Sequence, residues 1–128
     1  MAEHKARILV IDDANLVRLY YRQILEAAGY EVDEAFNGLE ALEKLTGNPP
    51  DLLIVDVNMP QMDGMTFLAT LRRRPLPLSG IPALVTSTES GAQDMAAARA
   101  AGANYYLVKP LSPIVLTEHV AMLCGLPA

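Results

Sequence analysis

The segment LLIVD, residues 52–56, is a continuous apolar run that ends in an acid, and the segment ILVIDD, residues 8–13, repeats this pattern earlier in the chain. Short apolar runs without polar alternation are typical of strands that are buried on both faces of a parallel sheet. We therefore expect two such strands, with Asp12, Asp13 and Asp56 at their carboxyl ends.

The rest of the chain alternates strand-like and helix-like segments. Apolar periodicity and glycine or proline breaks predict strands at 7–11, 31–35, 52–55, 81–86 and 105–108, and helices at about 16–28, 39–45, 65–73, 94–101 and 114–123. Asn37-Gly38 is expected to form a turn, and Gly64 to permit the turn into the third helix. This order predicts one α/β domain over residues 1–128, with a core of about 7–124 and an open sheet covered on both faces.

Composition and charge exclude several classes of protein. The chain has 128 residues, of which 52% are hydrophobic, enough for one core, and a formal net charge of −5. Acidic surfaces repel phosphate backbones, so nucleic acid is not an expected partner. No apolar run approaches the length of about 18 residues that a membrane span needs, which predicts a cytoplasmic protein with no membrane partner. Cys124 is the single cysteine, so an intramolecular disulfide is impossible.

Polar residues follow four of the predicted strands. In doubly wound sheets of flavodoxin-like order 2-1-3-4-5, ligands bind beyond the carboxyl ends of the strands, where strands one and three lie side by side. This order brings Asp12 and Asp13 close to Asp56, while Ser87 and Lys109 open onto the same rim. Clustered carboxylates repel one another unless a cation intervenes, and Mg²⁺ prefers such oxygen ligands. The alternative is that the first two acids cap a helix, the third begins a turn, and the lysine is solvated.

At these residues the chain resembles the CheY-like receiver domains of two-component response regulators. The resemblance runs from Ile8 to about Leu123 and rests on Asp12-Asp13, the segment DVNMPQMDG at 56–64, Ser87 and Lys109-Pro110. It implies that Asp56 is the phosphoacceptor and that Lys109 and Ser87 contact the phosphoryl group. It also implies a bound Mg²⁺, held by Asp13, Asp56 and the backbone carbonyl of Asn58, with Asp12 acting through water.

The resemblance further implies a conformational switch. Its members would be Ser87 and Tyr106, with Thr88 and Glu89 influencing access to the phosphoryl group and a cis peptide bond between Lys109 and Pro110. The signal would be read on the face formed by the fourth helix, the fifth strand and the fifth helix.

Two assignments within this switch stay open on sequence alone. Thr86, Ser87 and Thr88 could each supply the hydroxyl, and the family pattern counted back from Lys109 selects Ser87. Tyr105 and Tyr106 must face opposite sides of a strand, so only one can belong to the switch.

The expected role is signalling, with self-catalysed phosphotransfer and dephosphorylation, rather than turnover of a metabolite. The phosphoryl donor would be a histidine kinase or a histidine phosphotransfer protein, in a chemotaxis or relay pathway, and the regulator would be a monomer or a phosphorylation-dependent dimer. The alternative is a phosphohydrolase or phosphotransferase enzyme, which is disfavoured because Asn58 stands where a second acid would be needed. Arg72-Arg73-Arg74 is interpreted as a solvated helix end rather than a binding patch.

Overall fold

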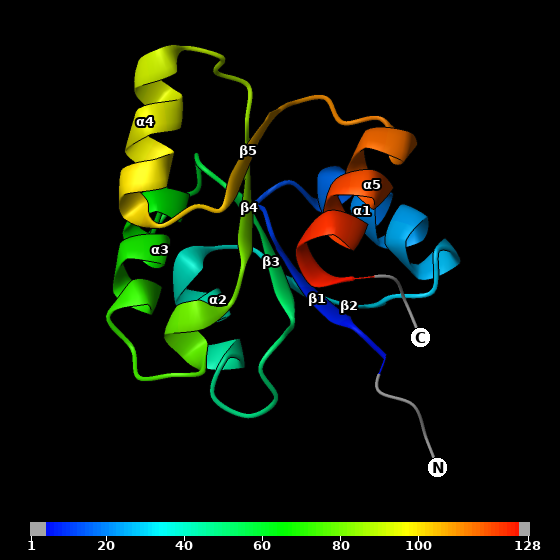
Figure 1. The fold of residues 1–128 in the computed structure, drawn as a ribbon, viewed down its shortest axis with the longest axis horizontal. Coiled ribbons are helices and arrows are strands. Elements are labelled where there is room, and N and C mark those ends of the chain that lie inside the picture. The colour runs from blue at the N-terminus through cyan, green and yellow to red at the C-terminus, as the bar shows by residue number, and fades with distance from the viewer. Residues whose placement is uncertain (1–4, 126–128) are drawn as a thin grey trace.

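The computed structural model describes residues 5–125 as a single five-stranded parallel sheet with helices on both faces (Figure 1). The strand order is β2-β1-β3-β4-β5, which is the predicted flavodoxin-like order. The strands are β1 (Arg7–Ile11), β2 (Glu31–Ala35), β3 (Leu52–Asp56), β4 (Ala83–Ser87) and β5 (Tyr105–Val108). The helices are α1 (Asn15–Ala27), α2 (Gly38–Lys44), α3 (Gly64–Arg72), α4 (Ala92–Ala101) and α5 (Pro113–Cys124), with a short 3-10 helix, η1 (Leu78–Gly80).

Two apolar cores lie on the two faces of the sheet. In β3, Leu53 and Val55 pack in the core beneath α2, α3 and α4, whereas Leu52 and Ile54 pack in the core beneath α1 and α5. Figure 1 shows this division, with α1 and α5 together on one side of the strands and the other three helices opposite. The continuous apolar runs of the sequence thus reflect burial on both faces.

Helix starts differ from the sequence prediction because of capping side chains. Asn37 does not form a separate turn: its side chain accepts a hydrogen bond from the Glu40 backbone N–H, so α2 begins at Gly38. Asp63 caps α3 in the same way through Thr66, and α3 begins at Gly64. Such caps satisfy backbone donors that the first helical turn leaves unpaired.

The other boundary differences lie at α1, which spans Asn15–Ala27 rather than about 16–28, and around β4, α4 and α5. β4 begins at Ala83, two residues later than predicted, and includes Ser87. The helix η1 was not predicted. α4 begins at Ala92 rather than 94, and α5 occupies 113–124 rather than 114–123. None of these differences changes the order or direction of the strands.

Arg72 corrects the prediction of a wholly solvated basic helix end. Its guanidinium donates to the Gly102 carbonyl at 2.7 and 3.0 Å, to Ile81 at 2.7 Å and to Ser79 at 3.0 Å. It also donates to the Asn104 side chain at 3.1 Å. Burial lowers the pKa of this guanidinium. Arg72 therefore ties the end of α3 to the segment before β4 and to the turn after α4.

Among residues 5–125, no helix is both long and apolar enough to cross a membrane.

Candidate functional site

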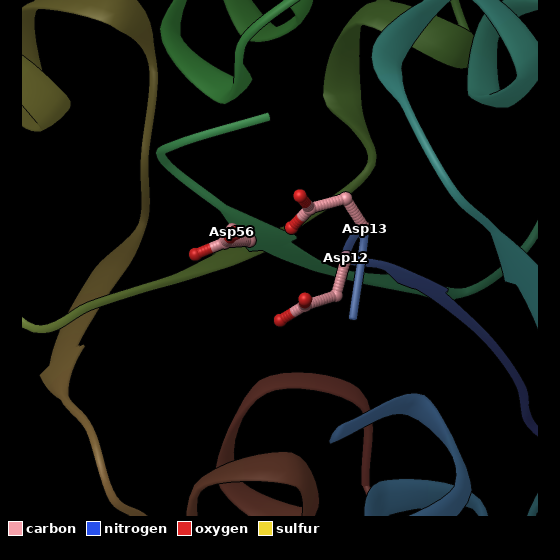
Figure 2. Close-up of side chains that lie close together, drawn as sticks. All are labelled: Asp12, Asp13 and Asp56. Carbon is pink, nitrogen blue, oxygen red and sulfur yellow. The ribbon is translucent and has the colours of Figure 1, made fainter. Parts of the chain in front are cut away.

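Three carboxylates meet at the ends of the two central strands. Asp12 and Asp13 directly follow β1, and Asp56 is the last residue of β3, which pairs with β1 so that Ile11 lies opposite Val55. One carboxylate oxygen from each acid lies within 4.8 Å of the others. Figure 2 shows the three carboxylates directed to the same side of the strand ends. Asp12 is 1% exposed and Asp56 is 7% exposed, whereas Asp13 is exposed.

The Lys109 ammonium bridges two of these acids. It donates to Asp12 Oδ2 at 2.8 Å and to Asp56 Oδ1 at 3.0 Å, and its side chain is only 16% exposed. Burial alone would lower the lysine pKa, but its hydrogen bonds and attraction to the two acids outweigh burial and raise the pKa. The interpretation of this lysine as a solvated charge is therefore wrong.

The contact between Lys109 and Asp12 was not predicted, since the sequence placed the lysine only on the same rim as the acids. The alternation of side chains along β1 could have predicted this contact. Val10 faces the core beneath α1 and α5, and Asp12, two residues later, continues toward that same face. The segment that carries the lysine, between β5 and α5, approaches from that face as well.

The pKa of Asp56 is raised above 3.8, primarily by burial and further by repulsion from Asp12 and Asp13, although Lys109 opposes the shift. The ionised carboxylate of Asp56 is therefore held at a cost in free energy. A further cation in the pocket would relieve that cost.

The alternative role of the first two acids as helix caps is wrong. α1 begins after Ala14, and no side chain caps it. Asp12 Oδ1 instead accepts a hydrogen bond from the Ala14 backbone N–H at 2.9 Å, which fixes the carboxylate while its other oxygen contacts Lys109.

Gly64 allows the third helix to approach the backbone of Asp56. A Cβ atom at residue 64 would lie 2.2 Å from the Asp56 carbonyl oxygen and 3.0 Å from a methyl carbon of Val55. The Gly64 N–H donates to the Val57 carbonyl at 3.0 Å. Its φ angle is not positive, so glycine is required for close approach rather than for the turn that the sequence suggested.

The three candidate switch hydroxyls occupy different places. Ser87 is buried, accepts a hydrogen bond from the Glu89 N–H at 3.0 Å, and lines a hollow of about 270 Å³ together with Asn58 and Tyr106. Thr86 points to the opposite face of the sheet, where its hydroxyl lies 3.5 Å from the Val55 carbonyl.

Thr88 is exposed and lines a different hollow, beside Lys109. Only Ser87 shares a hollow with Tyr106 among these three.

The two tyrosines of β5 face opposite sides, as predicted. Tyr106 packs against the core beneath α3 and α4, and its hydroxyl donates to the Glu89 carbonyl at 2.8 Å. Tyr105 packs edge-on against His119 of α5, with ring centroids 4.8 Å apart. The peptide bond between Lys109 and Pro110 is cis, as is the bond between Leu76 and Pro77, which was not predicted.

Comparison with known proteins agrees with this geometry. The family model of the response regulator receiver domain matches residues 8–121. The transcriptional regulatory protein PrrA of Mycobacterium bovis is 40% identical over 115 residues, which make up 90% of this chain and 47% of that protein. The chain thus spans about half the length of that relative. The chemotaxis protein CheY1 of Helicobacter pylori is 38% identical over 121 residues, which make up 93% of this chain and 97% of that protein.

A solved structure of the chemotaxis protein CheY4 of Vibrio cholerae superimposes with a TM-score of 0.87 at 34% identity, covering 94% of this chain and 99% of that one. The chain belongs to the response regulator receiver domain family, whose members are signalling proteins. Within that family it is CheY-like in sequence and in fold.

The residues present fit the Mg²⁺ that receiver domains bind in an acidic pocket. The cluster offers carboxylate oxygens alone, without nitrogen or sulfur ligands, and hard cations of this type prefer such donors. Three carboxylates share the pocket with the single ammonium of Lys109, and repulsion from Asp12 and Asp13 adds to burial in raising the pKa of Asp56.

Proposed function

We propose that Asp56 accepts a phosphoryl group from the phosphohistidine of a histidine kinase or a histidine phosphotransfer protein, and that the resulting acyl phosphate drives a conformational signal. The observation that carries this proposal is the Lys109 ammonium, which lies 3.0 Å from a 7%-exposed Asp56 carboxylate between two further acids. A carboxylate in this setting is nucleophilic, and a cation is already in place for the incoming phosphoryl oxygens.

In the proposed transfer, a carboxylate oxygen of Asp56 attacks phosphorus, the phosphorus–nitrogen bond of the donor breaks, and the imidazole leaves with the bonding electrons. Lys109 remains protonated because its pKa is raised, and its ammonium stabilises charge on the transferred oxygens. Water later cleaves the acyl phosphate and restores the carboxylate. The domain would thus catalyse its own phosphorylation and dephosphorylation without turning over a metabolite.

The metal assignment is part of this proposal. Asp13, Asp56 and the backbone carbonyl of Asn58 would hold Mg²⁺, and Asp12 would act on it through water. When bound, the ion would neutralise charge on the phosphoryl oxygens and on the crowded carboxylates.

The switch would use Ser87 and Tyr106. The hollow of about 270 Å³ that these two side chains line is also lined by Asn58 and Glu89. A phosphoryl group on the neighbouring Asp56 would therefore face polar groups whose contacts would change. Ser87 would supply a hydroxyl to a phosphoryl oxygen, and Tyr106 would turn inward. Thr88 and Glu89 would influence access to the phosphoryl group.

The proposed output is binding of a protein to the face formed by α4, β5 and α5. The match to CheY1 over 97% of that protein favours a chemotaxis-type regulator, and a phosphorelay intermediate is the second candidate. We place the protein in the cytoplasm, as a monomer or a phosphorylation-dependent dimer. The net charge of −5 favours a protein target over nucleic acid.

Labelling with acetyl phosphate tests the proposal against the phosphohydrolase or phosphotransferase alternative. Wild type and the control Asp33→Asn, which alters an acid paired with Lys44 rather than Lys109, should incorporate phosphate when Mg²⁺ is present. Asp56→Asn should not. Equal labelling of Asp56→Asn contradicts the assignment, and sustained turnover of a phosphate ester supports the enzyme alternative instead.

A further inference from the structure

The loop between β3 and α3, residues 57–63, contains a backbone conformation that favours glycine, yet a glutamine occupies it. Gln61 has a φ of 68°, and among residues 5–125 it is the only residue other than glycine whose φ is positive. The Met62 N–H donates to the Pro60 carbonyl at 2.8 Å, which closes a three-residue turn centred on Gln61. Such turns with a positive central φ are rare and strained, because the Cβ atom of an L residue crowds the backbone. A contact of the glutamine side chain is therefore expected to offset this strain.

The Gln61 side chain contacts Asn37, the residue that caps α2. The Asn37 Nδ2 group donates to Gln61 Oε1 at 3.0 Å. The orientation of the asparagine amide is fixed, because its Oδ1 atom accepts from the Glu40 N–H at 2.8 Å and its nitrogen must then face the glutamine. Asn37 is 4% exposed, so loss of the glutamine oxygen would leave a nearly buried donor unpaired. This hydrogen bond thus links the cap of α2 to the strained turn.

A backbone contact holds the same turn against α2. The Gly38 N–H donates to the Met62 carbonyl at 3.1 Å. A Cβ atom at residue 38 would lie 2.9 Å from that carbonyl oxygen and 2.7 Å from the Met62 side chain, so the start of the helix and the turn are in close contact. Substitution of Gln61 would leave this backbone contact intact. A variant can therefore test the glutamine side chain without detaching the whole loop.

The loop begins directly after Asp56, and its first residue is fixed on both sides. The Val57 N–H donates to the Thr86 carbonyl at 3.1 Å, and the Val57 carbonyl accepts from the Gly64 N–H at 3.0 Å. Asn58, whose backbone carbonyl is the proposed Mg²⁺ ligand, lies in the sequence between Val57 and the strained turn. The position of that carbonyl therefore depends on where the turn is held.

We propose that Asn37 and Gln61 are positioning residues, whose hydrogen bond holds the loop of residues 57–63 against its own backbone strain and thereby sets the affinity for Mg²⁺. The inference rests on the proposed metal role of the Asn58 carbonyl. Without the hydrogen bond, the strain favours other conformations of the turn, and the fraction of molecules with this carbonyl in place falls. The apparent affinity for the ion falls with that fraction.

Titration of the folded protein with Mg²⁺, followed by backbone amide shifts in ¹⁵N NMR, tests this role. Gln61→Ala keeps the backbone strain but removes the side-chain contact. It should bind Mg²⁺ about fivefold more weakly than wild type, the factor that corresponds to one net hydrogen bond. Asn37→Ser, which keeps a capping oxygen for α2 but lacks the amide donor, should weaken binding to the same extent. The double variant should be no weaker than either single variant, because the two residues share one interaction.

The variant Gln61→Gly separates the side-chain contact from the strain. Glycine cannot contact Asn37, but it adopts a positive φ without steric cost, so the affinity for Mg²⁺ should return to within about twofold of wild type. A general loss of packing would instead weaken Gln61→Gly at least as much as Gln61→Ala. The matched control is Thr46→Val, which removes a hydroxyl that donates to the Glu43 carbonyl at 2.9 Å, at the other end of α2. This control should leave the affinity unchanged.

Two sets of outcomes separate failure of this inference from failure of the proposed function. Suppose that Asp13→Asn weakens Mg²⁺ binding. If Gln61→Ala and Asn37→Ser then bind as tightly as wild type, or if Gln61→Gly binds as weakly as Gln61→Ala, the positioning role is overturned and the metal site stands. If Mg²⁺ binding depends on neither Asp13 nor Asp56, both the proposed metal site and this inference fail.

Discussion

Substitution of Gly64 by alanine should damage both stability and the phosphorylation site. The new Cβ atom would lie 2.2 Å from the Asp56 carbonyl oxygen, whereas a carbon and a carbonyl oxygen approach to only about 3.3 Å. The backbones of α3 and β3 must therefore separate by roughly 1 Å. The neighbour is backbone in a packed layer, so it cannot yield by rotation of a side chain. Overpacking of this kind costs about 1–3 kcal/mol, and we expect the upper part of that range.

Urea denaturation followed by circular dichroism measures this loss. The matched control is Gly47→Ala, because a Cβ atom there meets nothing within 4 Å and the residue has no positive φ. Its stability should change by less than about 0.5 kcal/mol, or rise slightly through reduced entropy of the unfolded chain. Folded Gly64→Ala should also accept phosphate from acetyl phosphate more slowly than wild type. Equal stability of Gly64→Ala and wild type would refute the close approach of α3 to Asp56.

Three further predictions concern charge and anchoring. Mg²⁺ at 100 times its dissociation constant should stabilise the folded protein by about 2.7 kcal/mol, seen as a rise in melting temperature that Asp13→Asn should reduce. An unchanged melting temperature in millimolar Mg²⁺ would count against the pocket. Because the pKa of Asp56 is raised, its protonated form favours the folded state: this contribution is complete below pH 3.8 and is lost as the pH rises. Asp56→Asn should therefore be more stable than wild type at neutral pH but not in acid, as measured by urea denaturation at several pH values. Arg72→Met should lose about 1–3 kcal/mol in urea, whereas the exposed Arg73→Met should lose little; equal losses would show that the carbonyl contacts of Arg72 are unimportant.

Four of the five strands could be predicted because each is a short, mostly apolar run with a polar residue at its carboxyl end, whereas β2 has the mixed sequence EVDEA. Continuous burial leaves no alternation, and the carboxyl ends of parallel strands share one edge, so the positions of Asp12, Asp56 and Lys109 followed from strand order alone. The order itself came from the rule for doubly wound sheets and from the chemistry at that edge.

The missed features depend on contacts between residues that are distant in the sequence. Arg72 looked like one of three equivalent cations, and nothing local distinguishes the residue that reaches the carbonyls of Ile81 and Gly102. Gly64 stands in a turn-like segment, but the reason for glycine is the Asp56 carbonyl across the layer.

Helix boundaries were missed for a local reason. Asn37 and Asp63 both suit turns and helix caps, and their side-chain oxygens accept from backbone groups three residues later. A side chain of this type permits either conformation until the packing of the following helix decides between them.

The central claim is that Asp56 is the residue that carries the phosphoryl group, and reductive trapping of the acyl phosphate followed by peptide mass spectrometry tests it most directly. After treatment with acetyl phosphate and Mg²⁺, borohydride should convert Asp56, and no other residue, to homoserine. Modification of Asp12 or Asp13 in place of Asp56, or stable phosphate on a serine, threonine or histidine, would contradict the account.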